Sequence, residues 1–217
     1  MAKGIKDPSY KKRIGYHAGL LAGMALIVSA VLAIGNKQTH SEILQRLEED
    51  KRATLDMVIP KNLYDNDLLS EIVKIIDIKN QETTVYVARK ENYVVAVAFM
   101  MMEQGYAGPI NVMLGVSKNG EILGARVISH QETPGLGDKI EIKKDRWILG
   151  FDGLSLENTR KNEWAVKKDG GKFDQFSGAT ITPRAVVKAI KHGLNLFNEK
   201  IIPGIIIHKA SNKKTDN

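Results

Sequence analysis

The sequence predicts an α+β protein in which one transmembrane helix precedes a domain built from an antiparallel sheet with flanking helices. Three observations predict this fold. Residues 14–35 form an uncharged apolar run, short segments rich in β-branched residues follow between about 61 and 130, and a helical apolar pattern begins near Pro183. The polar turns between the strand segments are short, which favours antiparallel pairing over a doubly wound parallel sheet.

Composition narrows the classes of function. The chain has 217 residues, enough for one domain of ordinary size and an appendage. Cysteine is absent, which excludes disulfides, cysteine-ligated metal centres and a thiol nucleophile. The net charge of +7 is mild and aromatic residues make up 6% of the chain, so we expect no nucleic-acid partner. The five histidines lack metal-ligand spacing, so we expect no metal site.

Residues 14–35 are predicted to cross a membrane. At about 1.5 Å per residue a helix of this length spans about 33 Å, and the hydrocarbon core of a bilayer is about 30 Å thick. The N-terminus, residues 1–13, is basic, with Lys3, Lys6, Lys11, Lys12 and Arg13 against Asp7. The positive-inside rule therefore places it in the cytoplasm and the rest of the chain outside. The alternative is a cleaved signal peptide ending near Ala33, but the apolar run exceeds the roughly 7–15 residues of a signal h-region.

Glycine recurs at every fourth position of this helix, at Gly15, Gly19 and Gly23. Small residues on one side let another helix approach closely. We therefore expect the helix to pack against partner helices in the membrane.

The remainder of the chain divides into three parts. Residues 36–60 form a linker predicted as an amphipathic helix, with leucines on one side and a charged run over residues 48–52 on a solvated side. Residues 61–207 form the predicted extracytoplasmic domain, and residues 208–217 form a polar tail.

The domain begins with strands. Asn119-Gly120 lies between two apolar runs and is the strongest hairpin indication in the chain. The predicted strands are Ile72–Ile78, Thr83–Ala88, Tyr93–Met100, Asn111–Ser117 and Glu121–Ser129.

The second half of the domain is predicted to mix helices, a strand and a turn. A helix begins at Pro183, with Thr182 as its N-cap, because proline has no N–H to lose at a first helical position. The other predictions are a helix over residues 138–150, a strand at Trp164–Val166, a turn over residues 168–171, and either a last strand or a docking patch at Ile201–Ile207.

The central motif is Asp174 to Arg184, which reads DQFSGATITPR. Small residues at Gly178 and Ala179 predict a tight turn that places Thr180 just before the N-terminus of the helix. Free N–H groups and a partial positive charge make such an end a natural place for a phosphate. Taken alone, the pattern fits a glycine turn with an ordinary helix cap equally well.

A second motif, Glu132 to Gly137, reads ETPGLG and follows the hairpin. Two glycines and a proline predict a defined turn in which the backbone can approach a ligand closely. Taken alone, this pattern indicates only a turn. His130 adjoins the loop and is expected at the surface.

The two motifs carry a resemblance. Asp174-x-x-Ser177-Gly178-Ala179-Thr180 resembles the D-x-x-[ST]-G-A-T motif at which a flavin transferase attaches FMN to threonine through a phosphoester. The second motif resembles the ETPGLG loop of the flavin-carrying subunit of bacterial membrane electron-transport complexes. From the membrane helix to about Phe197, the chain resembles the G subunit of the Rnf, or Rsx, ion-translocating electron-transport complex. The C subunit of the sodium-translocating NADH:quinone reductase is a relative that carries longer insertions.

The resemblance implies a function. FMN would be held on Thr180, with Asp174, Ser177, Gly178 and Ala179 shaping the attachment turn. The isoalloxazine or ribityl chain would be bordered by Glu132, Thr133, Gly135 and Leu136. Trp147 is expected in the core, with a place beside the flavin as the alternative.

The implied protein is a relay rather than an independent catalyst. Electrons would pass between ferredoxin and NAD through several subunits, coupled to ion transport. The expected partners are the other membrane subunits and the flavin transferase, and the expected place is the bacterial inner membrane with the FMN domain in the periplasm.

Two alternatives come from other classes. The chain could be a flavin-free assembly or tether subunit, which would show no flavin fluorescence after denaturation. It could also be a membrane-anchored flavin reductase, which would be active in isolation with soluble donors.

Overall fold

The computed structural model describes residues 14–76 and 82–205, and contacts group the chain into two compact units, Met1–Asp50 and Lys51–Asn217. The basic N-terminus and the polar tail lie outside the described residues. In the first unit, the stretch Ile14–Asn36 is 23 residues long, apolar enough to cross a membrane and not buried in the protein. No described atom lies within 4 Å of a Cβ built on Gly15, Gly19 or Gly23.

The helix is longer than predicted. Helix α1 runs without interruption over Ile14–Asp56, so the helical conformation predicted for the linker, residues 36–60, is confirmed as far as Asp56, as a continuation of the apolar segment. The segment after Asn36 is rich in Gln, Leu, Glu, Lys, Arg and Ala, which are good helix formers, and it contains no proline. Nothing in the local sequence therefore ends the helix at the point where the apolar run ends.

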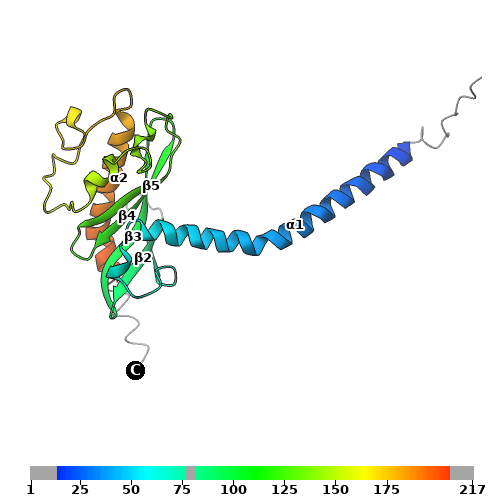
Figure 1. The fold of residues 1–217 in the computed structure, drawn as a ribbon, viewed down its shortest axis with the longest axis horizontal. Helices are drawn as coiled ribbons and strands as arrows, with labels where there is room; N and C mark the ends of the chain where they lie inside the picture. The colour runs from blue at the N-terminus through cyan, green and yellow to red at the C-terminus, as the bar shows by residue number, and fades with distance from the viewer. Residues whose placement is uncertain (1–13, 77–81, 206–217) are drawn as a thin grey trace, which may run out of the picture. The chain divides into compact units, whose positions relative to one another are not determined.

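The predicted antiparallel sheet is confirmed. Five strands pair with their sequence neighbours in the order β1-β2-β3-β4-β5 (Figure 1). In the β4–β5 hairpin, Gly120 has a φ of 83° and donates its N–H to the Ser117 carbonyl at 2.9 Å. The strands are β1 Ile72–Ile76, β2 Glu82–Lys90, β3 Tyr93–Gln104, β4 Pro109–Ser117 and β5 Ile122–Ser129; the end of the first predicted strand, at residues 77–78, lies outside the described residues.

Helix α2, Ile181–Leu196, covers one face of the sheet (Figure 1). Its buried side recurs every three or four residues, at Val186, Ile190 and Leu194. Gly193 lets the helix approach closely, because a Cβ at this position would lie 2.9 Å from Leu114 Cδ2. The larger of two hydrophobic clusters therefore lies between α2 and the sheet.

The predicted last strand at Ile201–Ile207 is wrong over its described part. A π-helical turn, η6 at Phe197–Ile201, continues α2, and helical structure runs on to Ile205. Phe197, Ile201 and Ile205 are buried and recur at every fourth residue. This period matches one side of a helix rather than a strand, so packing on the sheet selects the helix.

The opposite face of the sheet is covered by the end of α1 and the segment after it, which includes the short 3-10 helix η2, Lys61–Leu63. Leu55, Val58 and Ile59 are buried there. A Cβ on Gly115 would lie 2.2 Å from the Val58 carbonyl oxygen, so glycine is needed for the chain to cross the strands this closely. The sheet is therefore covered on both faces.

Residues 130–180 form the irregular part of the domain, and two predictions there are wrong. The helix predicted over residues 138–150 is broken into two short 3-10 helices, η3 Asp138–Ile140 and η4 Trp147–Phe151. The Asp145 carboxylate accepts the Trp147 backbone N–H at 2.8 Å, and this local bond competes with a continuous helix.

The predicted strand at Trp164–Val166 is reduced to one bridge between Val166 and Phe173. The predicted turn that follows is confirmed as the 3-10 helix η5, Lys167–Asp169, with Gly170 at a φ of 84°.

Candidate functional site

The structure brings the two sequence motifs to one cavity. This cavity has a volume of about 590 Å³ and lies at the N-terminal end of α2. It is bordered on one side by the ETPGLG loop and on the other by the turn that precedes the helix. Its lining residues are Tyr106, Glu132, Thr133, Leu136, Gly137, Lys168, Gly178, Ala179, Thr180, Ile181 and Thr182.

The attachment turn spans Phe176 to Ala179. The Ala179 N–H bonds to the Phe176 carbonyl at 3.1 Å, and Gly178 has a φ of 78°. These features match a β-turn that requires a positive φ at its third residue, which explains the glycine. The turn delivers Thr180 to the first position before α2.

Thr180, not Thr182, occupies the N-cap position of α2, so the predicted cap at Thr182 is wrong. The Thr180 carbonyl accepts the Arg184 N–H at 3.4 Å, while its side chain makes no capping hydrogen bond. Thr182 is instead buried at the second helical position, where its hydroxyl bonds to Glu132. Of these two threonines, only Thr180 is partly exposed, and its side chain makes no capping hydrogen bond.

Phe176, the first residue of this turn, packs in an aromatic cluster. Phe176 is buried, and its ring packs edge-on against Trp147 with centroids 5.3 Å apart. Trp147 is partly buried, packs against the hydrophobic core and does not line the cavity. Its Nε1–H donates to the Asp174 carbonyl at 2.9 Å. The Asp174 carboxylate points elsewhere and pairs with Lys167 at 2.6 Å.

The ETPGLG loop is a compact turn. The N–H groups of Leu136 and Gly137 both bond to the Thr133 carbonyl, at 3.1 and 3.0 Å, and Gly135 has a φ of 77°. Leu136 remains 44% exposed, and its Cδ2 atom would be 3.5 Å from a Cβ on Gly178. The two motifs therefore meet through Leu136 and Gly178.

Glu132 is the buried member of this loop, at 5% exposure. Its Oε1 accepts the Ala107 N–H at 3.0 Å, and its Oε2 accepts the Thr182 hydroxyl. A Cβ on Gly105 would lie 2.4 Å from Oε1, and one on Gly137 would lie 2.9 Å from the Glu132 Cβ. Two glycines thus make room for one carboxylate.

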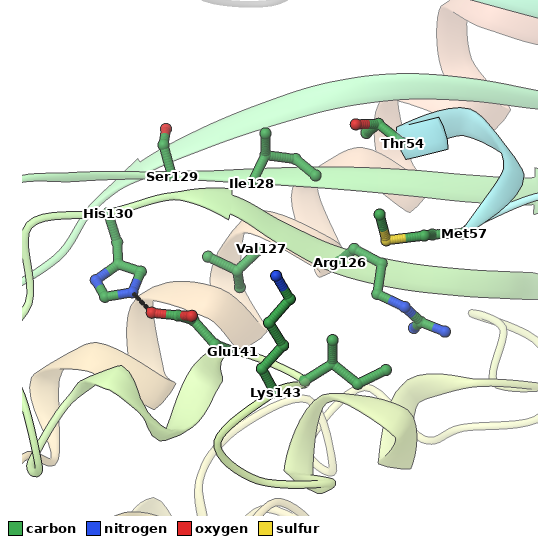
Figure 2. A pocket seen from close by; sticks show the side chains of 10 residues that line it. Thr54, Met57, Arg126, Val127, Ile128, Ser129, His130, Glu141 and Lys143 are labelled. Carbon is green, nitrogen blue, oxygen red and sulfur yellow. Dashed lines mark hydrogen bonds and ion pairs between the residues drawn. The ribbon is translucent and has the colours of Figure 1, made fainter. Parts of the chain in front are cut away.

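His130 was expected at the surface, and this is wrong: its side chain is only 11% exposed. Its Nδ1 accepts the Glu132 backbone N–H at 3.0 Å, so Nε2 carries the proton that faces Glu141 at 2.8 Å. Figure 2 shows the ring turned toward Glu141 at one end of a second cavity of about 430 Å³ beside β5.

The structure adds two side chains that the sequence motifs do not contain. Tyr106, from the β3–β4 loop, is 70% exposed at the cavity rim, and Lys168 comes from η5. Each lies in an ordinary polar turn of the sequence, so no local pattern marks it. Three predicted residues, Asp174, Ser177 and Gly135, do not line the cavity.

The cavity fits a flavin mononucleotide. Its volume falls in the range of about 300–1,000 Å³ that is typical of small-molecule sites. Leu136, Ile181 and Tyr106 supply apolar surface for a ring system, and the start of α2 with Lys168 supplies positive charge for a phosphate. Among residues 14–76 and 82–205, no group of three or more acidic or histidine side chains could hold a metal ion.

Comparisons with known proteins point to the same cofactor. Residues 105–195 match the FMN-binding domain family. The G subunit of the ion-translocating oxidoreductase complex from Stutzerimonas stutzeri is 45% identical, with 86% of this chain and 82% of that protein covered. The protein of the same name from Cereibacter sphaeroides is 50% identical, with 83% of each covered.

Similarity also extends to solved structures. Among them is the C subunit of the Na(+)-translocating NADH-quinone reductase from Parabacteroides distasonis, at 23% identity and a TM-score of 0.43, with 61% of this chain and 64% of that chain covered. The relatives from Stutzerimonas stutzeri and Cereibacter sphaeroides are similar to this chain over most of its length and of theirs. The chain belongs to the family of G subunits of ion-translocating oxidoreductase complexes.

Proposed function

We propose that this protein is a membrane-anchored flavoprotein subunit that carries FMN as a phosphoester on Thr180 and relays electrons within an ion-translocating ferredoxin:NAD oxidoreductase of the Rnf type. Membership of this family makes the chain an electron-transport subunit with an FMN-binding domain. To this we add a covalent bond to Thr180, a role as a relay and a periplasmic location.

The observation that carries the proposal is the placement of Thr180. Thr180 is partly exposed, its side chain makes no capping hydrogen bond, and the residue borders the cavity that the ETPGLG loop also borders. A hydroxyl in this position is accessible to a flavin transferase, and the phosphate it would receive lies at the N-terminus of a 16-residue helix. Thr182 is unsuited to the same reaction because it is 1% exposed.

FMN, when bound, supplies the one-electron chemistry, and the protein supplies position and electrostatics. Thr180 would hold the phosphate, and the N–H groups that begin α2 would stabilise its charge. Leu136 and Tyr106 would cover the ring and limit the access of water. Lys168 would favour added negative charge on the reduced cofactor.

The membrane helix supports the assignment to a membrane complex. Ile14–Asn36 is long and apolar enough to cross a membrane, and the relatives are named as subunits of ion-translocating complexes. The other subunits of such a complex are therefore the expected partners, and the N-terminus would lie in the cytoplasm with the FMN domain in the periplasm.

The proposal is tested by purifying the tagged full-length chain from membranes that contain its complex and its flavin transferase. We expect flavin fluorescence that stays with this chain on a denaturing gel, together with co-purifying membrane subunits. Partners without bound flavin would favour a tether. A bound flavin with full activity of the isolated chain toward soluble donors would favour a reductase.

A further inference from the structure

Glu132 and Thr182 form a buried contact between two segments that border the cavity. Both residues are almost fully buried, at 5% and 1% exposure, and the Thr182 hydroxyl donates to Glu132 Oε2. The two residues are separated by 50 positions. Thr182 lies two residues beyond Thr180 in the first turn of α2, and Glu132 opens the ETPGLG loop.

A third segment joins the same carboxylate. Glu132 Oε1 accepts the Ala107 N–H at 3.0 Å, which ties down the β3–β4 loop that also carries Tyr106. The Glu132 backbone N–H is held in turn by His130 at 3.0 Å. One side chain thus connects the start of α2, the ETPGLG loop and the β3–β4 loop.

Both carboxylate oxygens of Glu132 are therefore occupied by protein donors. Each oxygen already has a protein donor and the residue is 5% exposed, which limits how much of the carboxylate a ligand can reach, although Glu132 is among the residues that line the cavity. A buried acceptor that loses its donor is costly, which makes the geometry of the three segments interdependent.

We propose that Glu132 and Thr182 are positioning residues, which hold Thr180 and the ETPGLG loop in register for flavin attachment and do not act on the flavin directly. This inference rests on the proposed attachment to Thr180. It gives a role to the Thr182 hydroxyl, which is buried and bonds to Glu132. It also predicts that hydrogen bonds, rather than the charge of Glu132, matter for the site.

The first experiment compares attachment rates. The full-length chain is produced with limiting flavin transferase, and the flavinylated fraction is followed over time by intact mass. Thr182→Val keeps the volume and removes the hydroxyl, so attachment should slow by about ten- to a hundredfold, as expected when a reacting group is misplaced. Thr182→Ser retains the hydroxyl and should restore a rate close to that of the parent.

A matched control separates positioning from stability. Thr159 is also buried, at 2% exposure, and its hydroxyl donates to Asn158 Oδ1 at 2.9 Å, away from the cavity. Thr159→Val should lower the thermal midpoint but leave the attachment rate unchanged. If Thr182→Val does not accumulate as folded protein, Thr182→Cys replaces it, because a thiol is a weak donor of similar reach.

The second experiment asks whether Glu132 acts through its charge. Glu132→Ala leaves Ala107 and Thr182 without their acceptor and should slow attachment, whereas Glu132→Gln keeps an acceptor for Ala107 and can bond to Thr182 with the donor reversed, so it should recover most of the attachment rate. Attachment as slow in Glu132→Gln as in Glu132→Ala would mean that the charge and not the hydrogen bonds matters, and the proposal would be wrong. An unchanged attachment rate in Thr182→Val would also overturn it, whereas a parent without covalent flavin would refute the proposed function instead.

Discussion

The indole N–H of Trp147 donates a hydrogen bond to the Asp174 carbonyl at 2.9 Å, and its ring packs against Phe151 and Phe176. This contact fixes the residue that begins the attachment motif to the aromatic cluster of the domain. The second tryptophan, Trp164, is 5% exposed, and its indole N–H has no hydrogen-bond partner among the described residues. Trp147 and Trp164 can therefore be compared to measure what the Trp147 hydrogen bond contributes to the free energy of unfolding.

Trp147→Phe should lower the free energy of unfolding and loosen the attachment turn. It keeps most of the ring packing and removes the N–H, so the loss of the hydrogen bond should cost about 1 kcal/mol. Trp164→Phe also shrinks the ring but breaks no hydrogen bond, so it should cost less. Urea unfolding of both variants measures the difference, and equal losses would contradict a specific role for the Trp147 bond.

Gly178→Ala should destabilise the domain because of its backbone conformation. Its φ of 78° is unfavourable for alanine by about 1–2 kcal/mol. Gly204→Ala is the matched control: a Cβ at either position would meet a side chain at 3.5 Å, but Gly204 lies in helical structure without a positive φ. Thermal unfolding should therefore show a loss for Gly178→Ala only, and a loss of the same size for Gly204→Ala would point to crowding instead.

Acid should release the ion pair beside Lys168. The Arg184 guanidinium donates to both oxygens of Asp169, at 2.6 and 2.7 Å, and this holds the pKa of Asp169 below its ordinary value. A lowered folded-state pKa gives stability that is present above the unfolded pKa of about 4 and is lost as pH falls through the folded value. The thermal midpoints of the parent and Asp169→Asn should therefore differ near neutral pH and converge as the pH falls through the lowered pKa of Asp169. A difference between the two midpoints that does not shrink as the pH is lowered from neutral into the acidic range would exclude this ion pair as its source.

The fold was largely predictable because each pair of adjacent strands in the sheet is also adjacent in the sequence. Each strand pairs with the next strand in the sequence, and β-branched runs with Asn119-Gly120 between two of them identify that pattern. The predictions failed where tertiary contacts determine the secondary structure. Ile201–Ile205 is apolar enough for a strand, but burial at every fourth residue on the sheet makes it helical.

For the site, the sequence predicted the two motifs but not the other residues that line the cavity. The sequence places Thr180 before a helix, and the structure brings it to the ETPGLG loop. Tyr106 and Lys168 could not be predicted, because neither has a local pattern and both reach the cavity through the fold. The N-cap was misplaced by two residues because the Thr182 hydroxyl bonds to a distant carboxylate rather than to its own helix.

The charge distribution at the N-terminus predicts the topology. Five basic residues and one acidic residue precede the apolar run, namely Lys3, Lys6, Lys11, Lys12, Arg13 and Asp7. The positive-inside rule then places the FMN-binding domain outside the cytoplasm. A reporter that is active only in the periplasm should therefore be active when fused after Asn217. Activity of a cytoplasm-specific reporter at the same site would reverse the topology.

The central claim is that Thr180 is the attachment residue. The intact mass of the full-length chain, produced with its flavin transferase and measured after denaturation, tests this most directly. The parent should gain the mass of one FMN bound as a phosphoester, Thr180→Ser should gain it more slowly, and Thr180→Val should gain none while remaining folded. Covalent flavin that persists in Thr180→Val, on Thr182 or any other residue, would contradict the account.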